Sequence, residues 1–148
     1  LQDPGNVGTI LRTAEAFGIS RVLLSEDCPD LYSPKVLRAS MGGVFRMACE
    51  TVRDVPDTVR TLREAGVRVY AAALEDGARP VGEADLRGKV CIVIGNEGNG
   101  LPEEVIASCG GALLLPMRGR AQSLNAAMAA GIFIWEMTKA GGMDDGGI

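Results

Sequence analysis

Three segments of the sequence combine polar side chains with glycines in patterns that could hold a ligand and act on it. The first, DPGNVGTILRTAEAFG, carries Asn6 and Arg12. The second, VCIVIGNEGNGLP, runs from apolar residues directly into a glycine-rich stretch that holds Glu97. The third, LLLPMRGRAQSLNAAMAAG, contains Ser123 and Asn125. Guanidinium, amide, hydroxyl and carboxylate groups of this kind can bind a phosphate and orient a substrate.

Each segment taken alone also has a purely structural interpretation. Asn6 and Arg12 can belong to a capped helix with a solvated arginine. The glycine-rich stretch fits neither GxxxxGK[ST] nor GxGxxG and can be a strand-to-helix turn. Ser123 can be the N-cap of the last helix, which would leave Asn125 buried inside that helix and in need of a polar partner. Both interpretations stay open for each segment by itself.

The composition excludes several other chemistries. The 148 residues include no histidine, which excludes Ser-His-Asp hydrolysis and histidine-ligated zinc. The four cysteines form no CxxC pair, so we expect reduced thiols, no metal and a cytoplasmic protein. The longest charge-free apolar run, residues 126–135, is too short to span a membrane. A net charge of −4 excludes a surface that is basic throughout, but not a local basic patch.

Alternating helix and strand patterns predict the elements that position the three segments. We expect an α/β fold with a parallel sheet flanked by helices. Helices are expected at residues 4–17, 34–39, 55–65, from 102 onward and at 122–139, and strands or extended segments at 21–24, 44–52, 67–74, 90–94 and 112–115. The last helix is apolar nearly all round and is expected to be buried. Residues 1–140 should form one domain, with 141–148 as a flexible glycine-rich tail.

In this order and at this spacing, the three segments resemble the three motifs of the SpoU/TrmH family of SPOUT RNA ribose methyltransferases. NVGTILR matches the first motif, IGNEGNG the second and LPMRGRAQSLN the third. The resemblance implies a deep trefoil knot in the C-terminal part of the fold and S-adenosylmethionine (SAM) as cofactor. It implies methyl transfer to a ribose 2′-hydroxyl of RNA, with rRNA favoured over tRNA. It also implies a homodimer formed through the first and last helices.

The resemblance also assigns roles to individual residues. The implied catalytic residues are Asn6, Arg12, Glu97, Ser123 and Asn125. The implied cofactor-binding residues are Leu74, Ile94, Gly95, Asn96, Gly100, Leu115, Met117 and Leu124. Because a guanidinium keeps its proton, we favour Arg12 as a cation that binds the adjacent phosphate and stabilises a developing alkoxide, rather than as a base.

Positive charge for RNA is concentrated in two places along the sequence. Lys35 and Arg38, with Arg46 and Arg53 nearby, form one group, and Arg118 and Arg120 form the other. We expect both groups to line an RNA groove beside the active site, since phosphate contacts dominate RNA affinity. A doubly wound domain usually begins with a strand, so we also expect a first strand, and an N-terminal RNA-recognition domain of the kind common in the family, upstream of Leu1.

Two other interpretations remain open. One is a knotted RNA-binding or assembly module that has lost activity, which a methyl-transfer assay would distinguish. The other is a flavodoxin- or Rossmann-type nucleotide-binding protein, which would share the sheet and the glycine-rich turn and would bind ATP or NAD. The sequence does not identify the RNA or the nucleotide that is modified.

Overall fold

Helices and strands alternate along the chain, as the sequence predicts. The computed structural model describes residues 1–141, and residues 142–148 of the predicted tail lie outside the described residues. The elements of the first half are α1 (Pro4–Ala16), β1 (Arg21–Ser25), α2 (Pro34–Ser40), the 3-10 helix η1 (Gly43–Phe45), β2 (Ala48–Val52) and α3 (Val55–Glu64). Those of the second half are β3 (Arg68–Ala72), β4 (Arg79–Pro80), the 3-10 helix η2 (Val81–Glu83), β5 (Val90–Val93), α4 (Glu103–Ser108), β6 (Ala112–Leu114) and α5 (Ala126–Gly141).

The first and third helices begin at aspartate caps. The Asp3 carboxylate accepts a hydrogen bond from the backbone N–H of Asn6 (2.8 Å), and Pro4 occupies the first turn of α1. Asp54 accepts a bond of the same length from the N–H of Asp57 at the start of α3. These side chains satisfy N–H groups that have no partner within the helix.

The last helix begins four residues later than predicted. Asn125, not Ser123, is its cap: the Asn125 Oδ1 accepts hydrogen bonds from the N–H groups of Ala127 (2.9 Å) and Met128 (3.2 Å). Asn125 is therefore exposed at the start of α5, and the prediction that it is buried within the helix was wrong. An amide oxygen at the cap fixes the helix start because it replaces missing backbone acceptors.

Two shorter stretches also differ from the prediction. Residues 43–45 form η1, so only residues 48–52 of the expected extended segment 44–52 are a strand. β4 and η2 were not predicted, because two or three residues are too few to show a period.

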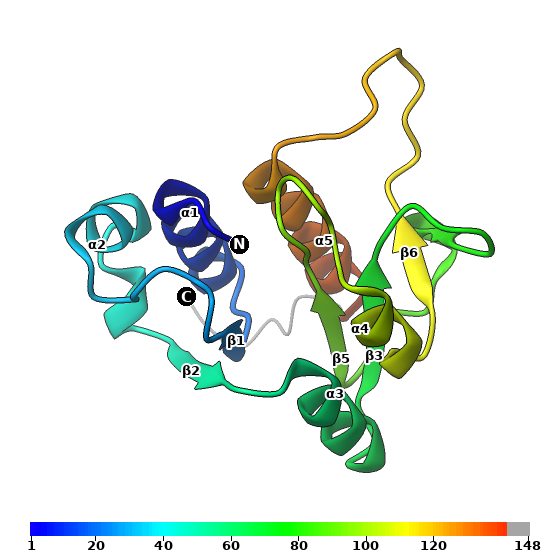
Figure 1. Cartoon of the computed structure of the whole chain (residues 1–148), viewed down its shortest axis with the longest axis horizontal. Helices are drawn as coiled ribbons and strands as arrows, with labels where there is room; N and C mark the ends of the chain where they lie inside the picture. Colours follow the sequence, from blue (N-terminus) through cyan, green and yellow to red (C-terminus); the bar gives the residue numbers. More distant parts are fainter. Residues whose placement is uncertain (142–148) are drawn as a thin grey trace.

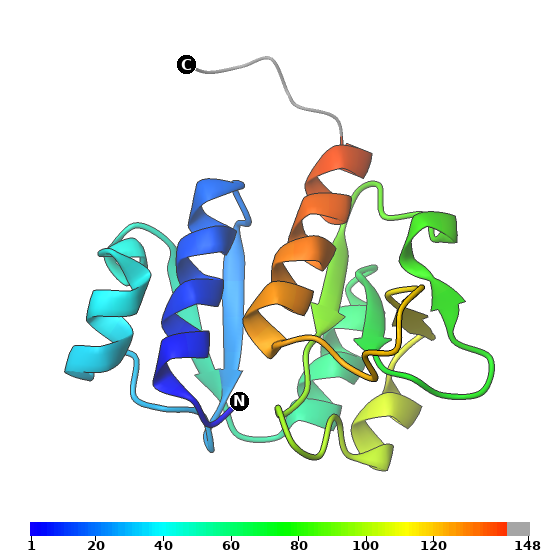
Figure 2. The ribbon, with the colours of Figure 1, turned by 90° about the horizontal axis from the view of Figure 1, so that it is seen from above.

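The strands form two parallel sheets rather than the single sheet expected. β1 pairs with β2, and the larger sheet has the order β4-β6-β3-β5. Figure 1 shows the two sheets side by side, and Figure 2 shows α1 and α5 running across the junction between them. The rings of Phe17 and Trp135 join these helices edge to face, with centroids 5.6 Å apart. Helix packing therefore connects the two sheets.

Each sheet has its own hydrophobic core. Val7 and Leu11 of α1 pack with Leu24, Val36 and Val44 over the small sheet. The larger sheet has cores on both faces, one under α3 and α4 and one under α5, where Phe133 packs with Tyr70 and Leu113. α5 buries only part of its surface, so the expectation of a wholly buried last helix was wrong. No helix within residues 1–141 has the length and apolarity needed to cross a membrane.

Candidate active site

A chain of side-chain hydrogen bonds joins the three motifs at the carboxyl ends of the strands. The Asn125 Nδ2 donates to the Asn6 Oδ1 (3.1 Å), and the Asn6 Nδ2 donates to the Glu97 Oε1 (3.1 Å). These residues are separated by up to 119 positions in the sequence. The caps of α1 and α5 and the glycine-rich turn after β5 bring them together, since each helix starts at the same edge at which the parallel strands end. We call these three residues the motif cluster.

Glu97 also ties the turn to the start of α1. Its carboxylate accepts hydrogen bonds from the backbone N–H groups of Gln2 (3.2 Å) and Asp3 (3.4 Å). Desolvation of Glu97 by itself would raise the pKa of this carboxyl, but the hydrogen bonds from Asn6 and from backbone N–H groups outweigh it and lower the pKa to about 2. Glu97 is thus a fixed negative charge and a hydrogen-bond acceptor at neutral pH.

The glycine-rich turn is a closed loop with little free space at its base. Asn96 and Gly100 exchange two backbone hydrogen bonds (2.9 and 3.0 Å), and the Asn96 Oδ1 accepts from the N–H of Gly98 (2.8 Å). A Cβ on Gly95 would overlap the carbonyl carbon of Gly100 and lie 2.6 Å from the Leu101 nitrogen. Gly95 therefore permits the close approach of two backbone segments that places Glu97 beside Asn6.

The residues predicted to bind the cofactor follow three adjacent strands. β3 lies between β6 and β5, and its register pairs Ala71 with Val93 and Ala72 with Leu113. Continued past the strand ends, the same register brings Leu74 level with Asn96 and Leu115. The large apolar side chains of Leu74, Met117 and Leu124 are exposed (69%, 37% and 40%) on the loops at this edge. The structure thus places Leu74, Ile94, Gly95, Asn96 and Leu115 at one edge of the larger sheet, whereas Met117 and Leu124 lie on the segment of residues 115–125 that extends from this edge.

Arg12 is not part of the motif cluster. It lies six residues beyond Asn6 on α1, about 9 Å along the helix axis and about 240° around it. Its backbone packs against η1, where a Cβ on Gly43 would lie 3.5 Å from the Arg12 Cα. The Arg12 guanidinium is exposed and makes no hydrogen bond or ion pair within residues 1–141.

Ser123, Arg118 and Arg120 lie on a segment without helix or strand, residues 115–125, that joins β6 to α5. Figure 1 shows this segment projecting from the body of the molecule, and all three side chains are exposed. Ser123 makes no side-chain hydrogen bond to any other described residue. Ser123 is therefore close to Asn125 in the sequence, but its side chain forms no hydrogen bond to the motif cluster in the structure.

The predicted RNA-binding residues fall into two separate groups. Lys35 and Arg38 are exposed on α2, which lies at the opposite end of the molecule from residues 115–125 in both Figure 1 and Figure 2. Two other cations of the first group are paired: Arg46 with Glu15 (3.1 Å) and Arg53 with Glu26 (3.2 Å). One protomer therefore does not gather these cations in a single groove.

The sequence did not reveal the role of the Gln2 and Asp3 backbone. Their N–H groups hold Glu97, and any residue type could supply such a donor. No sequence signal identifies a main-chain donor; only the position of the chain in space does.

Parallel sheets flanked by helices, with three loop motifs bonded together at one edge, define an α/β protein of the SPOUT class, the α/β knot fold. The chain belongs to the SpoU rRNA Methylase family, whose sequence model matches residues 1–135. This confirms both the predicted family and the predicted fold class.

Relatives and solved structures agree with this assignment. The chain is 36% identical over 137 residues to 23S rRNA (guanosine(2553)-2′-O)-methyltransferase RlmP of Bacillus subtilis, covering 93% of this chain and 54% of that protein. It is 40% identical to an AdoMet-bound rRNA methyltransferase from Sinorhizobium meliloti, with a TM-score of 0.87 over 93% of this chain and 52% of that one. It is 33% identical to the SpoU methyltransferase AviRb from Streptomyces viridochromogenes in complex with AdoMet, with a TM-score of 0.82 over 93% and 56%. The chain spans about half the length of the curated relatives it matches.

Proposed function

We propose that this chain is the catalytic domain, residues 1–140, of a SAM-dependent methyltransferase that modifies a ribose 2′-hydroxyl of RNA, with ribosomal RNA as the substrate class. The observation that carries the proposal is the hydrogen-bonded motif cluster, which joins all three family motifs in one place. The names of the relatives, one of them a 23S rRNA methyltransferase, support the choice of ribosomal RNA.

The edge formed by β6, β3 and β5 suits SAM. Exposed apolar side chains (Leu74, Met117 and Leu124) offer contact area for an adenine ring, and the partly buried backbone at Gly95 and Leu115 would offer polar groups for its edge. When bound, SAM supplies a methyl group that is already activated as a sulfonium. The protein then has to hold the ribose so that its 2′-oxygen faces that methyl group in line.

Different side chains of this chain position the ribose, bind the phosphate and stabilise the developing charge. Asn6, Glu97 and Asn125 fix the geometry of the edge, and Ser123 lies two residues from Asn125 on the adjoining segment. Arg12 binds the phosphate next to the target ribose and stabilises negative charge on the 2′-oxygen as it loses its proton to solvent. SAM held at this edge would supply its methyl group to the 2′-oxygen and would be released as S-adenosylhomocysteine.

The functional unit that we propose is a homodimer. Met128, Ile132 and Trp135 lie on one side of α5 at spacings of four and three residues, and they are 63%, 38% and 44% exposed. The intrachain packing of α1 on α5 uses Thr13 and places Phe17 against one edge of Trp135. It leaves a stripe of Met128, Ile132 and the rest of the Trp135 ring exposed within the described chain. A second copy covering the stripe would remove a contiguous apolar surface from water.

Calorimetric titration with SAM tests the cofactor site. We expect one site per subunit in the wild type and loss of binding in Gly95→Ala, because the added Cβ overlaps Gly100 and distorts the turn. Gly98→Ala is the matched control, since the nearest atom to its Cβ is 3.5 Å away, and it should bind normally. Circular dichroism must show that both variants are folded. Absence of SAM binding by the folded wild type would contradict the proposal.

Methyl transfer from labelled SAM to ribosomal RNA then tests the reaction. Arg12→Ala should lose roughly 100-fold or more in kcat, as expected for removal of a group that stabilises charge in the transition state. Arg12→Lys should recover only part of this loss, because an ammonium cannot bind a phosphate in the bidentate manner of arginine. SAM binding without any transfer would instead favour the inactive knotted module.

A further inference from the structure

We propose that Tyr32 and Phe45 form an aromatic platform on which an unpaired RNA base stacks, beside the cations Lys35 and Arg38. The proposal rests on the proposed RNA substrate and adds a contact surface that lies outside the three motifs. We call the rings of Tyr32 and Phe45 the aromatic platform.

The two rings form one exposed apolar surface. Their centroids lie 6.2 Å apart with 33° between the ring planes, and the residues are 63% and 69% exposed. Large apolar side chains rarely stay this exposed as an adjacent pair unless something covers them. Aromatic rings in such a position are the side chains on which unpaired bases of single-stranded RNA stack.

The backbone that carries each ring is held firmly. The N–H of Tyr32 donates to the Asp30 Oδ1 (2.7 Å), and the following residue, Ser33, caps α2. Arg46, next to Phe45, donates to both carboxylate oxygens of Glu15 (3.1 and 3.2 Å) and to the Met41 carbonyl oxygen (3.3 Å). The rings are therefore presented on fixed supports, which lowers the entropy lost when a ligand binds.

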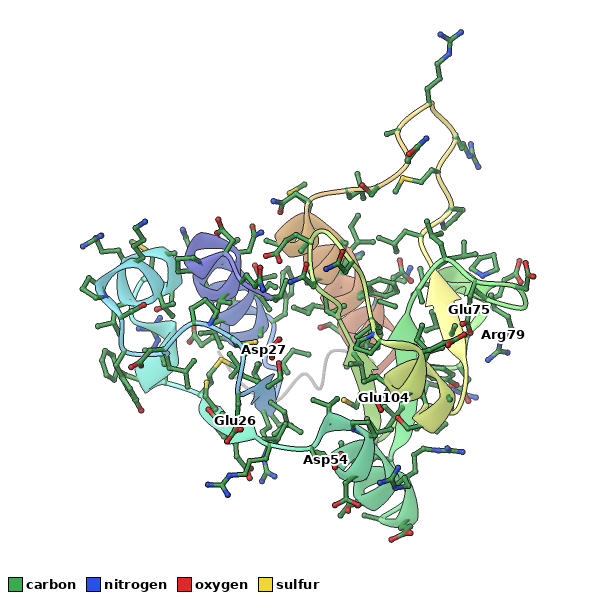
Figure 3. The ribbon with its side chains drawn as sticks, in the orientation of Figure 1. Glu26, Asp27, Asp54, Glu75, Arg79 and Glu104 are labelled. Carbon is green, nitrogen blue, oxygen red and sulfur yellow. The ribbon has the colours of Figure 1, made fainter. Side chains whose placement is uncertain are left out.

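The charges around the rings suit a polyanion on one side. Residues 32–46 contain Lys35, Arg38 and Arg46 and no acidic residue, in a chain of net charge −4. Lys35 and Arg38 lie three residues apart on α2 and form no ion pair within residues 1–141. The acids that precede this stretch, Glu26, Asp27 and Asp30, are on the loop at the end of β1, where Figure 3 labels the first two. The first acid that follows it, Glu50, is on β2. An RNA strand with a base stacked on the platform would thus place its phosphates over α2, beside Lys35 and Arg38.

The platform adjoins the part of α1 that carries Arg12, the proposed phosphate-binding residue. Phe45 is the last residue of η1, and η1 packs against α1 at Arg12, where the Gly43 Cβ position is 3.5 Å from the Arg12 Cα. α2 in turn crosses α1 so closely at Gly8 that a Cβ there would overlap that of Ala39. A nucleotide with its base on the platform can therefore belong to the same RNA segment as the phosphate that Arg12 binds.

The test uses a single-stranded twelve-nucleotide RNA that carries 2-aminopurine, whose fluorescence falls when it stacks on a ring. We expect the wild type to quench the probe, and Tyr32→Ala and Phe45→Ala each to reduce quenching and weaken RNA affinity by about 10-fold. Tyr32→Trp, which keeps an aromatic ring at this position, should retain both the quenching and the RNA affinity of the wild type. Met41→Ala, which removes a non-aromatic side chain that is 63% exposed on the same stretch, is the matched control and should bind as the wild type does.

Further measurements distinguish the aromatic platform from a protein interface, from misfolding and from a failure of the methyltransferase proposal. Lys35→Gln with Arg38→Gln should reduce the salt dependence of RNA affinity while quenching persists at low salt. If the wild type binds RNA and both ring variants bind equally well, the platform is wrong and the methyltransferase proposal stands. If the ring variants instead change the oligomeric state, the surface is a protein interface and the platform is also wrong. SAM binding should be unchanged in all variants, so loss of RNA binding through misfolding is recognised.

Discussion

Asn125 holds two parts of the site at once, and its two hydrogen-bonding groups can be separated by mutation. Its oxygen caps α5, and its Nδ2 donates to Asn6. Asn125→Asp keeps a good cap but removes the donor, whereas Asn125→Ala removes both. We expect the alanine variant to lose about 1 kcal/mol in the free energy of unfolding and the aspartate variant to lose less. Both should bind SAM more weakly.

Urea denaturation and SAM calorimetry on the same samples measure the two effects. Equal stability losses in the two variants would show that the cap contributes nothing. Wild-type SAM affinity in Asn125→Asp would show that the bond to Asn6 does not support the cofactor site.

The hydrogen bonds of Glu97 to the start of α1 predict how the stability of the protein changes with pH. Because its pKa is lowered in the folded protein to about 2, the bonded carboxylate stabilises the fold at pH values above its ordinary value of 4.5. This contribution is lost as the pH falls from about 4.5 through about 2. The stability of the wild type relative to Glu97→Gln should therefore decline over that range and stay constant above it.

The unfolding free energies of the wild type and Glu97→Gln should be compared between pH 7 and pH 2. The contributions of the other carboxylates cancel in the difference, because these groups titrate in both proteins. The carboxyl carbon shift of Glu97 in an NMR titration reports its pKa directly. A midpoint near 4.5 would mean that the bonds to Asn6, Gln2 and Asp3 do not hold in solution.

At the scale of elements, the crossing of α1 and α2 depends on the absence of a side chain at Gly8. A Cβ there would overlap the Cβ of Ala39 and lie 2.8 Å from the Val36 carbonyl oxygen and 2.9 Å from the Ser40 nitrogen. Gly8→Ala should therefore destabilise the protein by about 1–3 kcal/mol, because two helices must move apart. It should also weaken RNA binding, because a shift of α2 moves Lys35 and Arg38 and the neighbouring platform.

Gly131→Ala is a matched control on α5. Its Cβ would lie 3.9 Å from the Thr13 Cγ2, an ordinary contact, so the higher helix propensity of alanine should leave stability unchanged or raise it by up to about 1 kcal/mol. Thermal unfolding of Gly8→Ala and Gly131→Ala measures the two changes in stability. A Gly8→Ala protein as stable as Gly131→Ala would refute a close helix crossing.

At the scale of the whole molecule, the exposed stripe on α5 predicts the oligomeric state. We expect the wild type to sediment as a dimer and Met128→Glu to sediment as a monomer at the same concentration, because a charge cannot be buried there without a partner. Met128 is 63% exposed, so its replacement should leave the monomer fold intact, as circular dichroism can check.

Lys139→Glu also places a glutamate at an exposed position near the end of α5 and serves as the control for acidic charge elsewhere on the helix. It changes the net charge by two units and removes the ion pair with Glu136 (2.8 Å), so it is the harsher of the two changes. A wild type that is monomeric at all concentrations would contradict the dimer. A Met128→Glu protein that remains dimeric would place the interface elsewhere.

The sequence by itself determined the order of the elements and the identity of the motifs. Asp3, Asp54 and Pro4 carry their capping signal locally, because a side chain and an N–H a few residues apart form the bond. The apolar periods of residues 55–65 and 67–74 are equally local. The three motifs resembled a known family through residue types and order alone, which needs no knowledge of distance.

Only the tertiary structure decided which of those residues meet. Asn6, Glu97 and Asn125 are bonded because the three segments that carry them reach one edge of the larger sheet. Arg12 belongs to the same motif as Asn6 but lies on another side of α1. The predicted start of α5 was wrong by four residues because both Ser123 and Asn125 are suitable caps by type, and only the structure shows that the Asn125 oxygen accepts the first N–H groups. The exposed pairing of Tyr32 with Phe45 was likewise invisible. Contacts between residues distant in the chain depend on packing, and packing is a property of the whole fold.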